Sequence, residues 1–220
     1  QVVFCISLLL SLLALLTTQL NRDGMLYVTA AEAFIDEGYA GARAIFSWPF
    51  MPMIMGITAK LTGLSPEHSA HTLNALFMAG ACALLVDSAR RMHKESVWWV
   101  ALALLAIPGI NEYRNELLRE FGYWFFVLLS FWLALKWDEQ PSWIGYLAVV
   151  SALACAMLFR PEAVVLYAAL LGWQATSTIG GERRRRMVML IAPAAAAGIL
   201  LLAFFFSGLL GERLTGELNR

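Results

Sequence analysis

Long apolar runs separated by short polar stretches make up most of the 220-residue chain. Hydrophobic residues reach 60% of the chain, a share that is rare in soluble domains. Because crossing the ~30 Å hydrocarbon core of a bilayer takes about 20 helical residues, the runs predict membrane-spanning helices. Seven are expected, near residues 2–20, 68–89, 97–110, 121–136, 143–159, 163–176 and 187–210. The predicted fold class is all-α, a polytopic membrane helical bundle with about seven transmembrane helices.

Clusters of basic residues indicate how this bundle is oriented. Arg90, Arg91 and Lys94 follow the second run, and Arg183–Arg186 precede the seventh. Short loops rich in Lys and Arg stay in the cytoplasm, and with seven crossings both clusters fall on the same side. The amino terminus is therefore expected to be cytoplasmic. Three segments are then expected on the outer side, 21–66, 108–120 and 159–162, together with the carboxyl-terminal tail from Gly211.

The first outer segment is predicted to contain interfacial helices, which lie along the membrane surface. Asp23 can cap a helix that runs to about Glu37, and Gly38 fits its end. Apolar Leu26 and Phe34 alternate with polar residues at helical spacing, as expected of a helix at an interface.

Two prolines interrupt the second half of this segment. Pro49 and Pro52 are expected to prevent a regular helix there, so a second amphipathic stretch is expected over residues 53–64. Ser65 followed by Pro66 fits the start of the next spanning helix, with Ser65 as its cap.

The first candidate for chemistry is Asp23, which comes just after the first span and is flanked by Arg22 and a flexible Gly24. A carboxylate at this position could act as a general base on an acceptor hydroxyl or amine. Equally, Asp23 could serve only as the cap of the interfacial helix.

A second candidate is the charged stretch that leads into the aromatic fourth span. If this stretch is helical, Glu112, Glu116 and Glu120 share one face, with Arg119 beside Glu116. Such a face could line a site, or it could be an ordinary solvated face with local ion pairs.

The third candidate is the triplet Arg160-Pro161-Glu162 between two apolar runs. Pro161 is expected to start a new helix, which leaves Arg160 beside an amino-terminal helix end that favours anions. The alternative is that Arg160 simply pairs with Glu162.

Several common chemistries are disfavoured. The sequence has no Walker motif, dinucleotide glycine fingerprint, Gly-x-Ser-x-Gly elbow or His-Glu-x-x-His motif, which argues against ATP-driven transport, hydride transfer and common protease mechanisms. Its three cysteines lie in apolar runs and indicate neither a metal site nor a disulfide framework. No nucleic-acid partner is expected.

Taken in order, the outer motifs resemble those of the integral-membrane GT-C glycosyltransferases, a superfamily that includes protein O-mannosyltransferases and lipid A aminoarabinose transferases. Arg22-Asp23-Gly24-x-x-Tyr27, followed by Trp48-Pro49, is similar to their first outer loop. In that loop an Asp just after the first helix is used in catalysis. One departure is Gly24, which stands where some branches have a second acid.

Two later motifs extend the resemblance. Arg119-Glu120 is similar to an Arg-Asp pair in the second outer loop of the superfamily, with Glu120 in place of the commoner Asp. Arg160-Pro161-Glu162 is similar to an Arg-Pro-Glu turn of many bacterial members. The order, the spacing and the shared outward side of the motifs support the resemblance.

The resemblance implies transfer of a sugar from a polyprenyl-phosphate carrier to a glycan, lipid or protein acceptor at the outer face of a bacterial inner membrane. Asp23 and Glu120 would then be catalytic. The donor phosphate would be bound by Arg22, Arg119 and Arg160. Substrate-lining positions would be Tyr27, Trp48, Glu116 and Glu162. No metal ligands are assigned and no cofactor is required, although a divalent cation stays open.

The resemblance also bears on domain organisation. Members of the superfamily usually continue into an extracytoplasmic domain, so residues 1–210 are expected to form the transmembrane module and residues 211–220 to begin that continuation. Two other functions stay open. A lipid-linked-sugar transporter or flippase should line a path through the bilayer with charges, and a non-catalytic membrane subunit would bind a partner through its outer loop.

Overall fold

The computed structural model describes residues 1–17, 20–177, 188–189 and 191. By internal contacts the chain divides into two compact units, residues 1–166 and 167–220. The described residues form helices joined by turns, without a strand, so the predicted all-α class is confirmed. Most of the predicted seventh span and all of the continuation at 211–220 lie outside the described residues.

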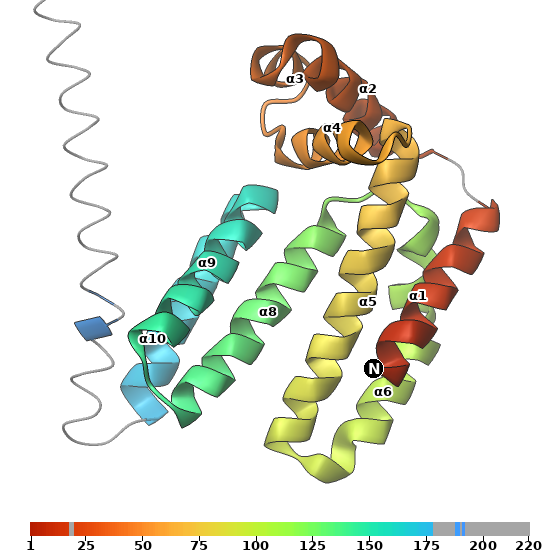
Figure 1. The fold of residues 1–220 in the computed structure, drawn as a ribbon. Helices are drawn as coiled ribbons and strands as arrows, with labels where there is room; N and C mark the ends of the chain where they lie inside the picture. Colours follow the sequence, from red (N-terminus) through yellow and green to blue (C-terminus); the bar gives the residue numbers. More distant parts are fainter. Residues whose placement is uncertain (18–19, 178–187, 190, 192–220) are drawn as a thin grey trace, which may run out of the picture. The chain divides into compact units, whose positions relative to one another are not determined.

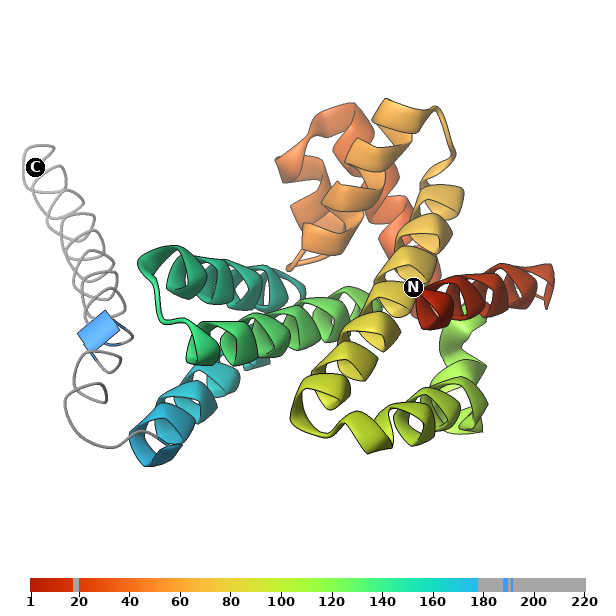
Figure 2. The ribbon, with the colours of Figure 1, turned by 60° about the horizontal axis from the view of Figure 1, so that its bottom comes forward.

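Helices form at six of the predicted spans. They are α1 (Val2–Ala14), α5 (Pro66–Met92), α6 (Val97–Ala106), α8 (Glu120–Glu139), α9 (Trp143–Phe159) and α10 (Val164–Ser177). In the first unit, α5 packs against α1 and α8, and α8 packs against α9, so these four helices lie side by side in that order (Figures 1 and 2).

Among the described helices, α5 is the one that is long and apolar enough to cross a membrane by length and composition. Shorter apolar helices include α1 and α9. A helical bundle is thus present, and the seven crossings stay a prediction.

Three further helices lie together where α5 begins (Figure 1): α2 (Arg22–Glu37), α3 (Tyr39–Ile45) and α4 (Phe50–Thr62). We call this the α2 end of the bundle. At the opposite end α5 finishes at Met92 and α8 finishes at Glu139, and we call it the Met92 end.

The start of α2 corrects the prediction that Asp23 is its cap. Asn21 is the cap, because its side-chain oxygen accepts a hydrogen bond from the Gly24 N–H over 2.7 Å, and Asp23 lies in the first turn. The predicted end is confirmed: α2 stops at Glu37, and Gly38 follows with φ 73°, a conformation that favours glycine.

The two prolines act differently from the prediction. Helix α4 already begins at Phe50, so the predicted start at residue 53 is wrong. Pro52 is tolerated because it lies in the first turn, where a backbone N–H has no intrahelical acceptor to lose. The predicted start of α5 is confirmed, with Ser65 as the cap and Pro66 in the first turn.

The segment between α6 and α8 is not one helix. It contains α7 (Pro108–Asn111) and a 3₁₀ turn, η3 (Glu112–Asn115), after which Glu116 is extended with φ −92° and ψ 149°. The next side chain, Leu117, is 1% exposed in the core of the α2 end, and the chain leaves the helical path to bury it. The predicted helical face shared by three glutamates is therefore wrong: Glu112, Glu116 and Glu120.

A buried arginine fixes this segment against α1. Arg114 is 5% exposed, and its Nη1 donates to the backbone oxygen of Ser7 over 2.9 Å and to the Ser11 hydroxyl over 2.7 Å. Its Nε donates to the Asn111 side chain over 2.6 Å. Hydrogen bonds of this kind offset part of the cost of burying a charge, and here they set the path of the chain towards α8.

Candidate functional site

An apolar cluster at the α2 end underlies the predicted site. It joins α2, α4, the start of α5, the segment before α8 and the end of α9. Its buried members are Tyr27, Ala31, Met51, Met55, Ala70, Leu117 and Phe159. All three predicted outer segments contribute to or adjoin this one core, so their polar residues are brought to the same end of the bundle.

Arg160 connects two of these segments. Its backbone is extended, with φ −145° and ψ 117°, as is usual for a residue before proline. From the end of α9 its Nη1 donates to Glu120 Oε1 over 3.1 Å, and its Nη2 donates to Glu162 Oε1 over 3.3 Å. Arg160 therefore bridges two carboxylates. Because all three side chains are partly exposed, the bridge orients groups more than it stabilises the fold.

A close approach of α8 and α9 makes this bridge possible. Gly122 lies in the first turn of α8, and a Cβ added there would be 2.2 Å from Phe159 Cε1. Only a residue without a side chain allows the Phe159 ring to lie on α8. The ring position in turn places Arg160, the next residue, beside Glu120.

Tyr27 is a buried aromatic residue at the α2 end. Its side chain is 4% exposed and packs edge-to-face on Phe46, with ring centroids 5.3 Å apart. Burial is the main cause that raises the pKa of its hydroxyl. Smaller electrostatic effects on this pKa come, in order of size, from Arg119, Glu120, Asp23 and Arg160. The Phe46 ring that packs on Tyr27 also lies under the Arg119 guanidinium, so Phe46 joins these two predicted site residues.

Arg119 differs from Arg160 in its partners. It precedes α8, and its guanidinium lies over the Phe46 ring, 5.8 Å from the centroid. Within the described part of the chain it forms no ion pair. The pKa of Glu162 is lowered by a hydrogen bond to its own backbone, by Arg160 and, more weakly, by Arg119. Both arginines therefore act on the same carboxylate.

Asp23 is exposed in the first turn of α2. Within the described segments its carboxylate accepts no hydrogen bond and forms no ion pair, so both oxygens are free to bind an added group. Arg22 is also exposed and makes no polar contact there. Its predicted role in phosphate binding stays a prediction.

Two residues predicted to line the substrate hold the segments together. Trp48 Nε1 donates to the backbone oxygen of Leu158 over 2.6 Å, which ties the α3–α4 connection to the end of α9. Its ring stays 43% exposed. Glu116 Oε2 accepts a hydrogen bond from Asn21 Nδ2 over 2.9 Å. Direct contact of either residue with a substrate stays a prediction.

Most of the chain matches one protein family. The profile of the dolichyl-phosphate-mannose-protein mannosyltransferase family matches residues 47–209. The chain belongs to this family. The family is membrane-integral and of the GT-C type, so the predicted superfamily and the glycosyltransferase class are confirmed at that level. No curated protein and no solved structure matches the chain.

The match to the mannosyltransferase family covers some site residues and not others. Arg119, Glu120 and Arg160 lie inside the matched stretch, whereas Asp23 and Tyr27 precede it. The role of each residue in this family member stays a prediction.

Sequence reasoning missed three residues of the site. Asn21 could have been found, because Asn is as good a helix cap as Asp and it precedes the apolar periodicity of α2. The other two are aromatic: Phe46 lies under the Arg119 guanidinium. Tyr123 lies under the Arg160 guanidinium, which is 6.0 Å from the centroid of its ring. No local pattern marks these two aromatic residues, since only packing brings them under the arginines.

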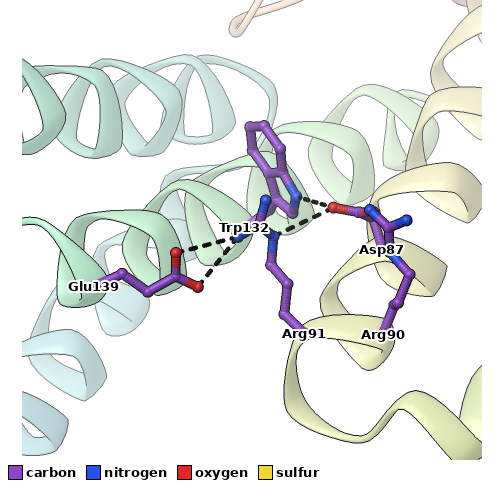
Figure 3. Close-up of polar contacts among 5 residues, drawn as sticks. All are labelled: Asp87, Arg90, Arg91, Trp132 and Glu139. Carbon is purple, nitrogen blue, oxygen red and sulfur yellow. Dashed lines mark hydrogen bonds and ion pairs between the residues drawn. The ribbon is translucent and has the colours of Figure 1, made fainter.

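A second polar cluster of this family member lies at the Met92 end (Figure 3). Trp132 on α8 donates to Asp87 on α5 over 2.7 Å, and Arg91 bridges Asp87 to Glu139. Arg90 also pairs with Asp87. Every charge drawn in this cluster has a partner of opposite sign, so we interpret it as a structural link between α5 and α8.

Beside this link, a mainly apolar cavity of about 330 Å³ opens between α5 and α8. Its lining includes Gly80, Leu84, Phe125 and Leu129. Asp87 is its one acidic lining residue and is already paired. Across the described ranges, no group of three or more His, Cys, Asp or Glu side chains could hold a metal ion.

Proposed function

We propose that the chain transfers a sugar from a polyprenyl-phosphate donor to a hydroxyl or amine of a glycan, lipid or protein acceptor, at the outer face of a bacterial inner membrane. Membership of the mannosyltransferase family supports the donor and the reaction class. The observation that carries the proposal is the bridge from Arg160 to Glu120 and Glu162, with Arg119 directly before Glu120, at the end of the bundle where Asp23 lies in the first turn of α2. These groups supply what the reaction needs, a base for the acceptor and cations for a departing phosphate.

Each group has a part in the proposed step. Asp23 accepts the proton of the acceptor, whose oxygen or nitrogen forms a bond to C1 of the sugar. The bond from C1 to the phosphate oxygen breaks, and its electron pair leaves with polyprenyl phosphate. Arg119 holds that phosphate through charge-assisted hydrogen bonds. Arg160 adds a second contact, and Glu120 orients Arg160.

The division between the arginines follows from their contacts. Arg119 has no carboxylate partner within the described residues, so a phosphate can approach its guanidinium without displacing an ion pair. Arg160 already bridges Glu120 and Glu162. A phosphate near Arg160 must compete with these two carboxylates, and we therefore assign the stronger phosphate contact to Arg119.

The proposed orientation places the α2 end outside and the amino terminus in the cytoplasm. Arg90, Arg91 and Lys94 gather where α5 ends, which suits the cytoplasmic side of a membrane. The site lies at the other end of α5. A lipid-linked donor held at the outer surface would then reach Arg119 from the bilayer.

The test is transfer by the full-length protein reconstituted in liposomes, with polyprenyl-phosphate-mannose and a hydroxyl-bearing peptide or glycan as acceptor. Asp23→Asn keeps the size of the side chain and removes the base, so the rate should fall by about 10²-fold or more. Asp36→Asn is the matched control, because Asp36 is exposed near the other end of α2.

Full transfer by Asp23→Asn would overturn the assigned role of Asp23. No transfer from any of several polyprenyl-phosphate sugars by the wild-type protein would overturn the function itself. The same assay with a metal chelator determines whether a divalent cation takes part.

A further inference from the structure

A hydrogen bond joins the two segments that carry the proposed base and the proposed phosphate ligand. Asn21, directly before α2, donates from Nδ2 to Glu116 Oε2 over 2.9 Å, across 95 residues of sequence. The oxygen of the same Asn21 amide accepts from the Gly24 N–H over 2.7 Å. The Asn21 side chain therefore caps α2 with its acceptor and binds Glu116 with its donor.

The Glu116 side of this bond is anchored to the bundle. The Glu116 backbone oxygen accepts a hydrogen bond from Asn74 Nδ2 of α5 over 3.4 Å. The next residue, Leu117, is buried in the core. A Cβ added at Gly24 would lie 3.0 Å from Leu117 Cβ, so α2 presses closely on this segment. Glu116 thus provides a fixed point to which the start of α2 is tied.

The position of the bond relates it to the reacting groups. Asp23 lies two residues after Asn21, whereas Arg119 lies three residues after Glu116. Fixing Asn21 on Glu116 therefore fixes the first turn of α2 beside the start of α8. We propose that Glu116 is a positioning residue, which acts through Asn21 to hold the Asp23 carboxylate against the phosphate-binding arginine. This inference rests on the proposed function of Asp23.

The chemistry of the two partners explains why these residue types occur together. Asp can also cap a helix but has no donor for Glu116, and Ser or Thr would have to cap and donate through one hydroxyl on a shorter side chain, whereas Asn has a separate oxygen and nitrogen. A carboxylate is the strongest acceptor for such an amide, because its charge shortens and strengthens the bond. The sequence predicted that Glu116 lines the substrate, whereas this bond gives it a part in holding α2.

A first experiment measures the tether without any substrate. Deuterium exchange of the full-length protein is followed in a peptide that covers the first turn of α2, which contains the Gly24 amide. Glu116→Ala should raise exchange there by about tenfold, since the cap loses its support. Glu112→Ala is the matched control, because Glu112 is an exposed acid on the same segment. It should leave exchange in α2 unchanged.

A second experiment measures the consequence for the reaction. Glu116→Ala should lower kcat about tenfold, since a misplaced base loses orientation, while the KM for polyprenyl-phosphate-mannose changes little. Glu116→Gln keeps an oxygen for Asn21 and should restore most of kcat. Asn21→Asp keeps the cap but loses the donor, so it should reproduce the loss. The double variant Asn21→Asp with Glu116→Ala should lose no more than either single variant.

Unchanged exchange in Glu116→Ala would overturn the tether. Raised exchange with unchanged kcat would overturn the positioning role, and so would additive losses in the double variant. A wild-type protein without transfer activity would instead overturn the proposed function. In that case the exchange measurement still decides the tether, because it needs no substrate.

Discussion

Arg160 at the end of α9 donates a hydrogen bond to Glu120 at the start of α8, over 3.1 Å. This contact unites two motifs that lie 40 residues apart in the sequence. It also pairs the Arg160 guanidinium, which the sequence predicted to bind the donor phosphate, with a carboxylate. The proposed site therefore contains one arginine that is already paired with carboxylates and one, Arg119, that is not.

The difference between the two arginines predicts unequal effects on donor binding. Arg119→Ala should raise the KM for the polyprenyl-phosphate donor by about tenfold or more, because a desolvated contact to phosphate is lost. Arg160→Ala should raise it less, since carboxylates already compete for that guanidinium. Both KM values are measured by following the transfer rate as the donor concentration is varied. Arg43→Ala is the control, because Arg43 is exposed on α3. Equal effects of the two variants would contradict the assignment.

Gly122 should tolerate no larger residue. Gly122→Ala places a methyl group against the Phe159 ring, and overpacking of this kind costs about 1–3 kcal/mol. The variant should lower both the thermal unfolding temperature and the transfer rate. Phe159→Leu in the same chain should recover part of the stability by making room.

Gly109→Ala is the matched control for this substitution, because an added Cβ there meets nothing within 4 Å. If Gly122→Ala unfolds no earlier than the wild-type protein, the close packing of α8 on α9 is wrong.

The buried Tyr27 hydroxyl predicts a loss of stability at alkaline pH. Burial raises its folded-state pKa above the ordinary tyrosine value of 10.0. Its contribution is therefore fully present below pH ~10 and is lost as the pH rises through the folded-state pKa. Tyr27→Phe removes this titration, so the variant should lose less stability than the wild-type protein between pH ~9 and ~11. Thermal unfolding across this range measures it, and equal losses would contradict the burial of Tyr27.

The cluster at the Met92 end predicts an effect on stability without an effect on chemistry. Asp87→Ala removes the acceptor of Trp132 and one partner of each of two arginines. The loss should be about 1 kcal/mol, because these side chains are partly exposed. The unfolding temperature should fall while the donor KM stays unchanged. A changed KM would mean that the cluster communicates with the site.

Much of the fold follows from local features of the sequence. Apolar runs predict helices because a helix satisfies its backbone hydrogen bonds within its own segment, so it needs only apolar side chains to be buried or embedded in lipid. Ser65 and Pro66 mark the start of α5, and Gly38 marks the end of α2, because each acts within one turn of its position. Such signals are readable without knowing any tertiary contact.

The failures of prediction have a common physical origin. Pro52 enters α4 because its place in the first turn, rather than its residue type alone, decides whether a hydrogen bond is lost. Glu116 is extended because the next residue, Leu117, is needed in a core built from four other segments. No short stretch of the sequence shows that Leu117 must be buried there.

The candidate site divides in the same way. The sequence by itself determined which charged residues the chain carries, on which segments, and the glycosyltransferase family to which they belong, because motifs and helix signals are local. Only the tertiary structure decided that Arg160 pairs with Glu120, that Asn21 binds Glu116 and that Tyr27 is buried. These relationships depend on how closely helices approach, which is set by packing at positions such as Gly24 and Gly122.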